Sequence, residues 1–559
     1  MSDAAPGLFL GQSDKPEHLL FHRANRHGVV AGATGTGKTV TLQIMAQGFS
    51  DAGVPVFCAD VKGDLSGIAV PGSPNEKLLA RAEGMGLTLQ PKAAPTPRRG
   101  LRTLIRGVDV LTMDDKFTEL LGVDVLLDGG KIAAIGKNLS VADAEVIDAR
   151  GMILMPGMVD GHRHTWQSIH PGHVVKTEPG YSGHYQASKM KYMVAFTPED
   201  MHFANYVGGL TAISTGVTSI IDYAHVQHTP ALADAAAAGL KESGVAGWYC
   251  WQISHTPSYG PGARIPLRQA EADREALPEA WRYEHAAKMR DKYFSDSSGL
   301  LKFGLALSAA PKNNFAQIKD EITRCRQLGA GKIVHHYRTP INPPPGAYRG
   351  IPDLHDHGLM GPEMHFDHAN NLTDEDLRIM RDHGASMCST VMGEFPYDQP
   401  PAHWRARAAG VAASIGVDVP LALNNDYFEN TRAAFWNMYR TPEGAKMAGT
   451  YHSYDVLDYA TRLGNRALRQ ESYAGSVVQG MRADLVLLRT DRFGFAPFGS
   501  LASRVLNFAS WGDIDSVWIA GVARKRNGEM VGVDMAKIKQ KQIEIQEKAS
   551  KIADTIVFT

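Results

Sequence analysis

The chain has 559 residues, which is too many for one ordinary domain, and length alone indicates two to four. Its 58 basic and 59 acidic residues give a formal net charge of -1, so composition offers no support for a nucleic-acid or membrane partner. The sequence contains no apolar run of about 18 residues or more and no basic region leading into an apolar core, so we expect neither a membrane span nor a signal peptide.

The four cysteines are far apart in the sequence and form no Cys-x-x-Cys pair. They are Cys58, Cys250, Cys325 and Cys388. Such cysteines are typical of buried or incidental thiols in a reducing compartment. We therefore expect a soluble, cytoplasmic protein.

The N-terminal region, residues 1–90, contains a glycine-rich loop at 32–39 that matches the P-loop pattern in full. A strand-like run at 28–31 precedes the loop, and a helical run, Val40–Phe49, follows it. In this context, backbone N–H groups hold phosphates, the lysine reaches the outer phosphates and the last threonine binds magnesium. The candidate nucleotide-binding residues are Gly32, Gly35, Gly37, Lys38 and Thr39.

The segment 20–68 resembles the start of a bacterial HerA-type ATPase or DNA translocase. No later apolar strand ending in acidic residues supplies a Walker B element before the central region begins. Some ninety residues can form only two or three strands of a doubly wound sheet, too few to cover both faces. We therefore expect a partial P-loop segment without ATP hydrolysis. Weak phosphate binding by this segment is an alternative. The segment could have arisen by gene fusion or as the remnant of a truncated ATPase, and the sequence does not distinguish these origins.

A linker and a β domain are predicted next. Residues 91–100 are rich in proline and basic residues, which indicates an exposed linker. Short strands with turns fill residues 101–156, including a hairpin at 123–136 whose turn is Asp128-Gly129-Gly130. Similar strands return in the region 471–533. We therefore predict a small β-sandwich built from both regions around a large insertion.

The insertion spans residues 157–470 in this prediction. Strand-like runs alternate with helical runs along it. The eight strand-like runs are 152–159, 218–224, 245–253, 301–308, 332–336, 363–367, 385–390 and 412–417. Eight strand–helix units in about 310 residues predict an α/β protein with a (β/α)8 TIM barrel. The last residues, 534–559, contain a helix at about 535–553 that is rich in lysine and glutamine, and we expect it to be a solvated tail.

Metal-ligand residue types follow four of the predicted barrel strands. They are His162 and His164 after strand one, His335 and His336 after strand five, His368 after strand six and Asp418 after strand eight. The strands of such barrels end at the active-site face, and three imidazoles with one carboxylate suit a zinc-like ion holding a water. A lone histidine at a strand end is more often a surface or core residue, and an aspartate there can cap a helix. Four such strand ends together favour the metal site.

The predicted site suggests a hydrolytic mechanism. A bound metal would lower the pKa of its water toward ~7 and so supply hydroxide at neutral pH. Asp418 could take the proton of the attacking water and return it to the leaving group. His368 could polarise the substrate or orient the hydroxide.

At these residues the chain resembles the amidohydrolase superfamily, closest to its cytosine deaminase and chlorohydrolase-like branch. The resemblance covers about residues 101–533, and its motifs lie at 155–164, 214–222, 368–376, 410–418 and 475–484. It implies one divalent metal, zinc with iron or manganese as alternatives, held by His162, His164, the strand-five histidine and Asp418. His368 would be a catalytic histidine outside the ligand set. Asp426 competes for the strand-eight role, but the Gly-Val-Asp pattern favours Asp418.

Two departures from the family limit the substrate prediction. Deaminases of this branch usually carry a glutamate three residues after the strand-five histidine, whereas this chain has Arg338 or Thr339, depending on the ligand. We prefer His335 as that ligand, although strand alternation does not decide against His336. Glu394, after strand seven, is a candidate acid or substrate contact.

Strand four offers no inward lysine for a carbamate bridging two metals, because Lys302 and Lys312 lie at or beyond its ends. We therefore expect one metal ion.

The sequence thus predicts a metal-dependent hydrolase that cleaves a carbon–nitrogen bond other than a peptide bond, of the deaminase or cyclic-amide type. One alternative is hydrolytic dechlorination of a triazine-like ring. Another is a nucleotide-binding module in which the P-loop segment acts and the barrel is passive. We expect a small-molecule substrate, no membrane or nucleic-acid partner and, by the family resemblance, a homo-oligomer.

Overall fold

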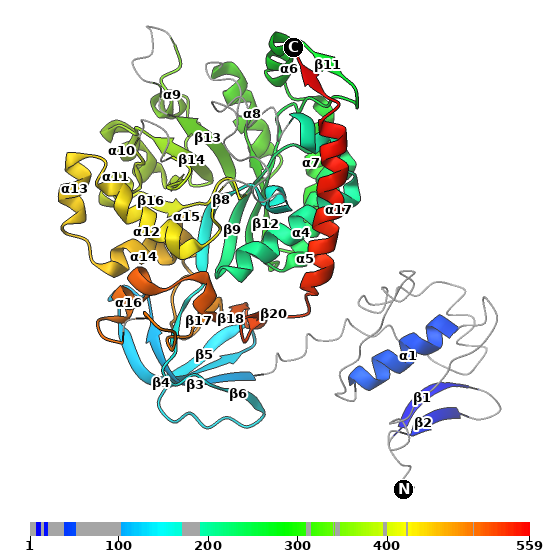
Figure 1. Ribbon diagram of the computed structural model, residues 1–559, viewed down its shortest axis with the longest axis vertical. Coiled ribbons are helices and arrows are strands. Elements are labelled where there is room, and N and C mark those ends of the chain that lie inside the picture. The colour runs from blue at the N-terminus through cyan, green and yellow to red at the C-terminus, as the bar shows by residue number, and fades with distance from the viewer. Residues whose placement is uncertain are drawn as a thin grey trace. The chain divides into compact units, whose positions relative to one another are not determined.

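The computed structural model describes residues 7–12, 16–20, 38–51, 102–169, 190–308, 315–338, 340, 347–394, 400–420, 423–495 and 497–559. The chain separates into two compact units, Met1–Arg99 and Gly100–Thr559, and each is considered by itself (Figure 1). Within these ranges, every helix is too short or too polar to cross a lipid bilayer.

The first unit contains one hairpin and one helix among its described residues. Strand β1 (Gly7–Gln12) pairs antiparallel with β2 (Pro16–Leu20), and helix α1 spans Lys38–Asp51. The helix predicted at Val40–Phe49 is therefore confirmed, with Lys38 and Thr39 as its first two residues. The predicted strand at 28–31, the linker at 91–100 and the loop glycines Gly32, Gly35 and Gly37 lie outside the described residues.

The second unit is built around eight parallel strands that neighbour one another in chain order. They are β8 (Met158–Arg163), β9 (Val217–Ala224), β10 (Ala246–Gln252), β12 (Leu301–Ala306), β13 (Ile333–Arg338), β14 (Met364–Asn370), β15 (Ser386–Ser389) and β16 (Ala412–Ile415). The last strand returns to the first through two backbone hydrogen bonds, from His164 N to Asp418 O and from Asp418 N to His162 O. The predicted (β/α)8 barrel is confirmed (Figure 1).

Helices connect successive strands and cover the outside of the barrel. They are η3 (Thr165–Ile169), α4 (Pro198–Ser214), α5 (Pro230–Ser243), α6 (Leu267–Arg274), α7 (Ala280–Tyr293), α8 (Phe315–Gln327), α9 (Ile351–Asp356), α10 (Asp374–His383), α11 (His403–Ala408) and α12 (Tyr427–Met438), followed by α13 (Pro442–Ala448), α14 (Ser453–Ala460) and α15 (Arg462–Ala467). Their starts follow local rules. A threonine caps α4 and α10 and exchanges hydrogen bonds with an aspartate three residues later, so both helices begin with a capping box.

Barrel side chains alternate between two apolar layers, as expected for strands. Ile333, Phe366 and Ala413 belong to the large outer core under the helices. Val159 and Val334 instead belong to a small inner core. This assignment of faces decides which polar side chains can meet inside the barrel.

The first predicted strand, at 152–159, is wrong as a single element. Its first half, β7 (Ile153–Pro156), pairs with strands of the β domain, and only β8 enters the barrel. Gly157, between the two, is packed against Thr218. A continuous apolar run can serve two sheets because both strands are buried on both faces, so hydrophobicity does not mark the boundary.

The β domain draws strands from both sides of the barrel, as predicted. They are β3 (Arg102–Leu111), β4 (Glu119–Asp128), β5 (Lys131–Gly136), β6 (Ala144–Asp148) and β7 from one side, and β17 (Leu485–Leu488), β18 (Ile514–Ile519), β19 (Val522–Arg526) and β20 (Glu529–Met530) from the other. Asp128 pairs with Lys131, which confirms the predicted hairpin turn. All nine strands belong to one hydrogen-bonded sheet joined through β7 rather than to two separate sheets.

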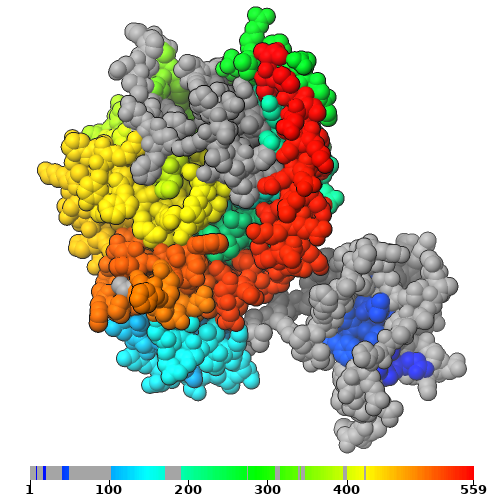
Figure 2. Space-filling model, viewed as in Figure 1, coloured from blue at the N-terminus to red at the C-terminus, as the bar shows by residue number. Residues whose placement is uncertain are grey.

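Helix α16 (Leu501–Phe508) lies between β17 and β18, and α17 (Met535–Ala553) follows the β domain. The bounds of α17 agree with the predicted helix, but it is not a solvated tail. Ile545, Ala549 and Ala553 are buried along one side, and Lys548 pairs with Asp200 of α4. Figure 2 shows α17 as a red ridge on the surface of this unit. The final strand, β21 (Val557–Phe558), pairs with β11 (Arg264–Ile265).

Buried His403 makes the stability of the second unit depend on pH. Its Nε2 donates to Ala434 O over 2.9 Å, and burial lowers the pKa of His403 to about 4. In the unfolded chain a histidine takes up a proton near pH 6.5, but folded His403 does not until about pH 4. Stability is therefore fully present above pH 6.5 and falls as the pH drops toward 4, by about 3 kcal/mol for this residue.

His403→Gln retains an N–H donor but does not titrate. We therefore expect the free energy of unfolding of this variant to fall less steeply between pH 6.5 and pH 4 than that of the wild type. Urea denaturation at pH 7, 5.5 and 4.5 measures the difference between the two proteins. Wild-type and variant stabilities that fall in parallel with pH would contradict the prediction.

Candidate metal centre

Two histidines and an aspartate converge where the barrel closes. His162 Nε2 lies 3.3 Å and His164 Nε2 lies 3.1 Å from the same oxygen, Oδ1 of Asp418. One ligand atom each from His162, His368 and Asp418 lies within 4.8 Å of the others. The structure thus brings together predicted residues from strands one, six and eight.

The proton positions at this cluster fit a divalent cation. His164 Nδ1 lies 2.9 Å from Tyr223 O, and a carbonyl oxygen can only accept, so Nδ1 carries the proton. His162 Nδ1 lies 2.6 Å from Asp367 Oδ2, and the carboxylate favours a proton on that atom too. The Nε2 atoms of both rings then face the Asp418 oxygen. A proton or a metal cation between nitrogen and oxygen makes such an approach favourable, and two imidazoles with a carboxylate are a donor set that zinc prefers.

The electrostatics of the cluster agree with this assignment. Burial disfavours the charged imidazole, but Asp367 and Asp418 outweigh it and raise the pKa of His162 to about 10. Burial would likewise raise the pKa of Asp418, but hydrogen bonds from His162 and His164 hold that pKa well below its usual range. The site therefore stabilises a positive charge beside Asp418, and binding of a metal there would release a proton.

The two candidate ligands on strand five lie on opposite faces of β13. Val334 belongs to the inner core, so alternation places His336 inside the barrel and His335 outside. The His336 ring centroid lies 4.3 Å from that of His368. The His335 ring contacts Tyr337 and Phe366 of the outer core instead, and burial lowers its pKa to about 4. We expected His335 as the ligand, but its ring lies toward the outer core, and it is the His336 ring that lies beside His368.

His368 reaches the cluster through a β-bulge. The register of β13 with β14 shifts between Tyr337 and Arg338, where Arg338 pairs with Asn370. Alternation from Phe366 places Asp367 inside and would place His368 outside. The extra residue is Ala369, and the positive φ of His368 and Ala369 (64° and 43°) turns the His368 side chain inward. The His368 ring lies 5.0 Å from the His162 ring, centroid to centroid. A similar register shift occurs in β8 between Asp160 and Arg163, around His162.

Two site residues have left-handed backbone conformations. His368 has a φ of 64° and Asp418 a φ of 66°. Non-glycine residues rarely adopt this region, which costs of the order of 1–3 kcal/mol each and is concentrated at functional sites. In Asp418, this conformation follows directly after the closing strand and accompanies the backbone hydrogen bonds to β8.

Glu394 lies behind His368 rather than at the metal site. Its Oε1 is 2.6 Å from His368 Nδ1, and its Oε2 accepts from Asn370 Nδ2 at 2.6 Å. Thr390 Oγ1 also donates to Oε1 at 3.0 Å. With a side chain only 1% exposed, Glu394 can hold the His368 ring but is not placed to act as a solvent-facing acid.

The remaining predicted positions have other roles or lie outside the described part of the chain. Asp426, the alternative for strand eight, caps α12 by accepting from Phe428 N. Lys302 donates to the Tyr473 hydroxyl at 2.8 Å. With His336 inside, the position of the missing glutamate is Thr339, which lies outside the described residues.

Sequence reasoning missed the carboxylate that contacts His162. Asp367 is fully buried on β14 and lies between His162 and His365. The sequence could have indicated this residue, because Asp367 alternates with Met364 and Phe366, which face outward. The prediction for this strand instead considered only the neighbouring His368.

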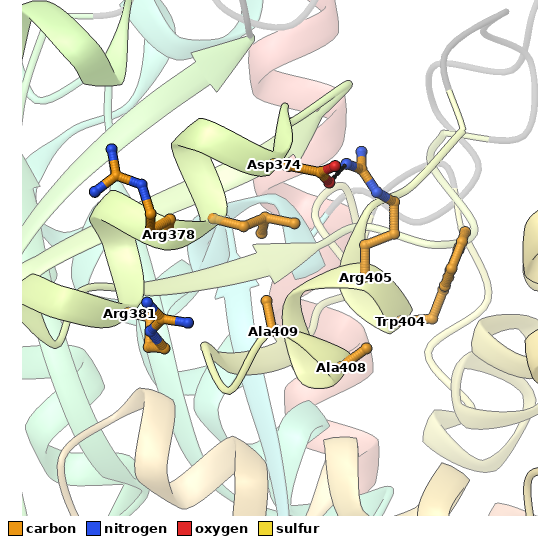
Figure 3. A pocket seen from close by; sticks show the side chains of 8 residues that line it. Asp374, Arg378, Arg381, Trp404, Arg405, Ala408 and Ala409 are labelled. Carbon is orange, nitrogen blue, oxygen red and sulfur yellow. Dashed lines mark hydrogen bonds and ion pairs between the residues drawn. The ribbon is translucent and has the colours of Figure 1, made fainter.

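A surface pocket of about 300 Å³ lies between α10 and α11, apart from the histidine cluster (Figure 3). Its walls include Arg378, Arg381 and Arg405, and Arg405 pairs with Asp374 at 2.6 Å. These side chains are unsuited to bind a metal cation, and this pocket is not the candidate centre.

Comparison with known families agrees with the fold and the residue cluster. The Amidohydrolase family profile matches residues 153–524. This range is more than half of the chain, and the protein belongs to the amidohydrolase family. A second profile, Helicase HerA-like C-terminal, matches residues 8–141, so the predicted likeness of the N-terminal segment is also found.

Similar proteins include deaminases from two microorganisms. A 5'-deoxyadenosine deaminase of Methanosarcina barkeri is 23% identical over 464 residues, covering 81% of this chain and 98% of the relative. A 5-methylthioadenosine/S-adenosylhomocysteine deaminase of Thermoanaerobacter pseudethanolicus is 22% identical over 460 residues, covering 78% and 97%.

Two solved structures share the fold. One is a zinc-bound adenosine deaminase from Xanthomonas campestris, with a TM-score of 0.66, 20% identity and coverage of 80% of this chain and 99% of that one. The other is a mutant atrazine chlorohydrolase from Arthrobacter aurescens complexed with zinc and atraton, with a TM-score of 0.67, 18% identity and coverage of 79% and 99%.

Neighbouring histidines provide a matched test of the metal centre. We expect His336→Gln to reduce the metal bound by the purified protein from about one ion per chain to a small fraction. His335→Gln should leave the metal content unchanged, because that ring faces the outer core. Elemental mass spectrometry on protein prepared without chelators or nickel resins measures both. Loss of metal from the His335 variant alone would contradict the assignment.

Proposed function

We propose that this amidohydrolase is a deaminase-type enzyme that cleaves a carbon–nitrogen bond of an amino-substituted or cyclic-amide heterocycle. The observation that carries the proposal is the convergence of His162 Nε2 and His164 Nε2 on one oxygen of Asp418 at the mouth of the barrel. Membership of the family and the deaminase relatives support the reaction class.

The proposed metal ligands are His162, His164, His336 and Asp418, with zinc as the metal because both solved relatives contain it. When bound, such a metal lowers the pKa of water toward ~7. Asp418, whose pKa is well below its usual range because His162 and His164 outweigh the effect of burial, is ionised at neutral pH. It can accept a proton from the attacking water and pass it to the leaving nitrogen.

His368 is proposed to contact the substrate while Glu394 keeps its ring fixed. Glu394 approaches Nδ1, so the opposite nitrogen, Nε2, is available toward the cluster. This carboxylate–imidazole pair compensates for the absence of a glutamate three residues after His336, where the chain has Thr339. Its role is to orient and polarise the substrate.

The substrate is proposed to be a small molecule with an amino group on an aromatic ring, and adenine nucleosides are the first probes because both deaminase relatives carry such names. A cytoplasmic location and a homo-oligomeric state remain parts of this proposal.

We expect the purified protein to release ammonia from 5'-deoxyadenosine, 5-methylthioadenosine or a related amino-heterocycle. Asp418→Asn should lower kcat by about 10³-fold, because it removes the group that transfers the proton. Asp382→Asn, a matched change on the surface of α10, should leave kcat unaltered. Ammonia release and circular dichroism together test this prediction, and undiminished turnover in the Asp418 variant would refute the mechanism.

Hydrolytic dechlorination is the second candidate, supported by the likeness to atrazine chlorohydrolase and by the missing glutamate. A chlorinated triazine distinguishes the two reactions, since dechlorination releases chloride and deamination releases ammonia.

The P-loop segment gives a different hypothesis, in which nucleotide binding is the function and the barrel is passive. Under that hypothesis Lys38→Ala would abolish function while the barrel histidines would be dispensable. We expect the opposite, namely that Lys38→Ala retains the hydrolase activity of the wild type. Assay of Lys38→Ala beside His162→Asn decides between the two, because only one of the variants should be inactive.

A further inference from the structure

Four polar side chains lie inside the barrel below the candidate metal centre and are not used by the proposed reaction. Lys332 precedes β13, His365 and Asp367 belong to β14, and Ser386 begins β15. Lys332, His365 and Asp367 are completely buried, and Ser386 is 2% exposed. We call these four residues the buried polar network. Interiors of such barrels are usually packed with branched apolar side chains, so this composition is unusual.

The network runs through hydrogen bonds from Lys332 to His365 and through ion-pair contacts from His365 by way of Asp367 to His162. Lys332 Nζ donates to Ser386 Oγ over 3.0 Å, and Ser386 Oγ lies 2.8 Å from His365 Nδ1. His365 Nε2 lies 3.4 Å from Asp367 Oδ1. The other carboxylate oxygen, Oδ2 of Asp367, lies 2.6 Å from His162 Nδ1.

The lower end of the network is anchored by backbone. Lys332 Nζ and Ser386 Oγ both contact the carbonyl oxygen of Ala467, at 2.6 Å and 3.1 Å. Ala467 is the last residue of α15, and it belongs to the inner core with Val159 and Val334. A lysine ammonium at a helix C-terminus is also favoured by the helix dipole.

Donors and acceptors along the network point in one direction. His365 Nε2 lies 3.2 Å from Gly161 O, which can only accept, so Nε2 carries the proton of the neutral ring. His365 Nδ1 is then an acceptor that faces the Ser386 hydroxyl at 2.8 Å, and the Ser386 oxygen accepts from Lys332. The Asp367 carboxylate lies at ion-pair distance from His365 Nε2 on one side and from His162 Nδ1 on the other. A carboxylate beside Nδ1 favours a proton on that atom, which keeps Nε2 as the nitrogen that can bind a metal.

We propose that the buried polar network is a positioning device that fixes the tautomer and ring orientation of His162 for metal binding. It rests on the proposed function, because it requires that His162 is a metal ligand. Lys332, Ser386 and His365 act through Asp367 and touch neither substrate nor metal. Partners that hydrogen-bond to metal-binding histidines raise metal affinity, and their loss typically weakens it about 10- to 100-fold.

Energetic considerations favour a positioning role over simple filling of space. A buried lysine and a buried aspartate are each costly to desolvate, and apolar residues of similar volume would pack at lower cost. Burial indeed lowers the pKa of Lys332 to about 7. The polar residues do, however, place a carboxylate beside one ring nitrogen of His162, which apolar packing could not do.

The test measures zinc affinity of metal-free full-length protein by competition with a chromophoric chelator. Ser386→Ala interrupts the network three residues away from His162 along the path, and we expect its zinc dissociation constant to rise about tenfold. Asp367→Asn should raise it more. Ser414→Ala is the matched control, because Ser414 is an equally buried barrel hydroxyl that donates to Met387 O outside the network. It should bind zinc within about twofold of the wild type.

A second readout separates positioning from general loss of stability. Ser386→Thr restores the hydroxyl and should recover zinc affinity, and the cobalt-substituted absorption spectrum should change in Ser386→Ala but not in Ser414→Ala. Equal zinc affinities of Ser386→Ala and Ser414→Ala would contradict the positioning role of the buried polar network, but they would not contradict the proposed metal site. Failure of the wild type to bind zinc or cobalt would overturn both.

Discussion

The closing pair of barrel strands is the constraint on which the rest of the site depends. Asp418 follows β16 and exchanges backbone hydrogen bonds with His162 of β8 and with His164 just after that strand, so the candidate ligand side chains of the first and last strands meet because the sheet is closed. The approach is tight. A Cβ atom on Gly416 would lie 2.7 Å from His162 O and 2.8 Å from His162 N, so only glycine allows the two backbones to meet there. The positive φ of Asp418 follows from the same junction.

Bulges provide what regular strands cannot. A strand of strict period two can direct only every second residue inward, yet β14 directs His365, Asp367 and His368 to the same interior. The bulge after His368 and the positive φ of His368 allow Asp367 to contact His162 while the next residue faces the candidate centre. Around His162 the register of β8 is also interrupted, which turns the ligand inward from a strand whose earlier inner residue is Val159. Local irregularity is therefore part of the design of the site rather than a defect in the sheet.

The sequence alone could predict the repeated strands and helices of the fold. It could not predict which individual side chains face the inside of the barrel. Eight apolar runs, the Asp128-Gly129-Gly130 turn and the polar residues after strands one, five, six and eight all follow from patterns that depend only on neighbours. The choice between His335 and His336 needed the inner face of β13, which is visible only once Val334 is seen to pack with Val159. The burial of α17 could have been read from Ile545, Ala549 and Ala553, which are spaced four residues apart on one side of the helix.

Both family matches extend into the nine-stranded sheet of the β domain. The helicase-like match reaches residue 141, yet residues 102–136 of it form β3, β4 and β5. Strand β3 pairs with β7, and β7 pairs with β17 beyond the barrel. Their side chains share one apolar core with Leu485 and Trp518. These strands therefore belong to the amidohydrolase fold, although the helicase-like match extends over them.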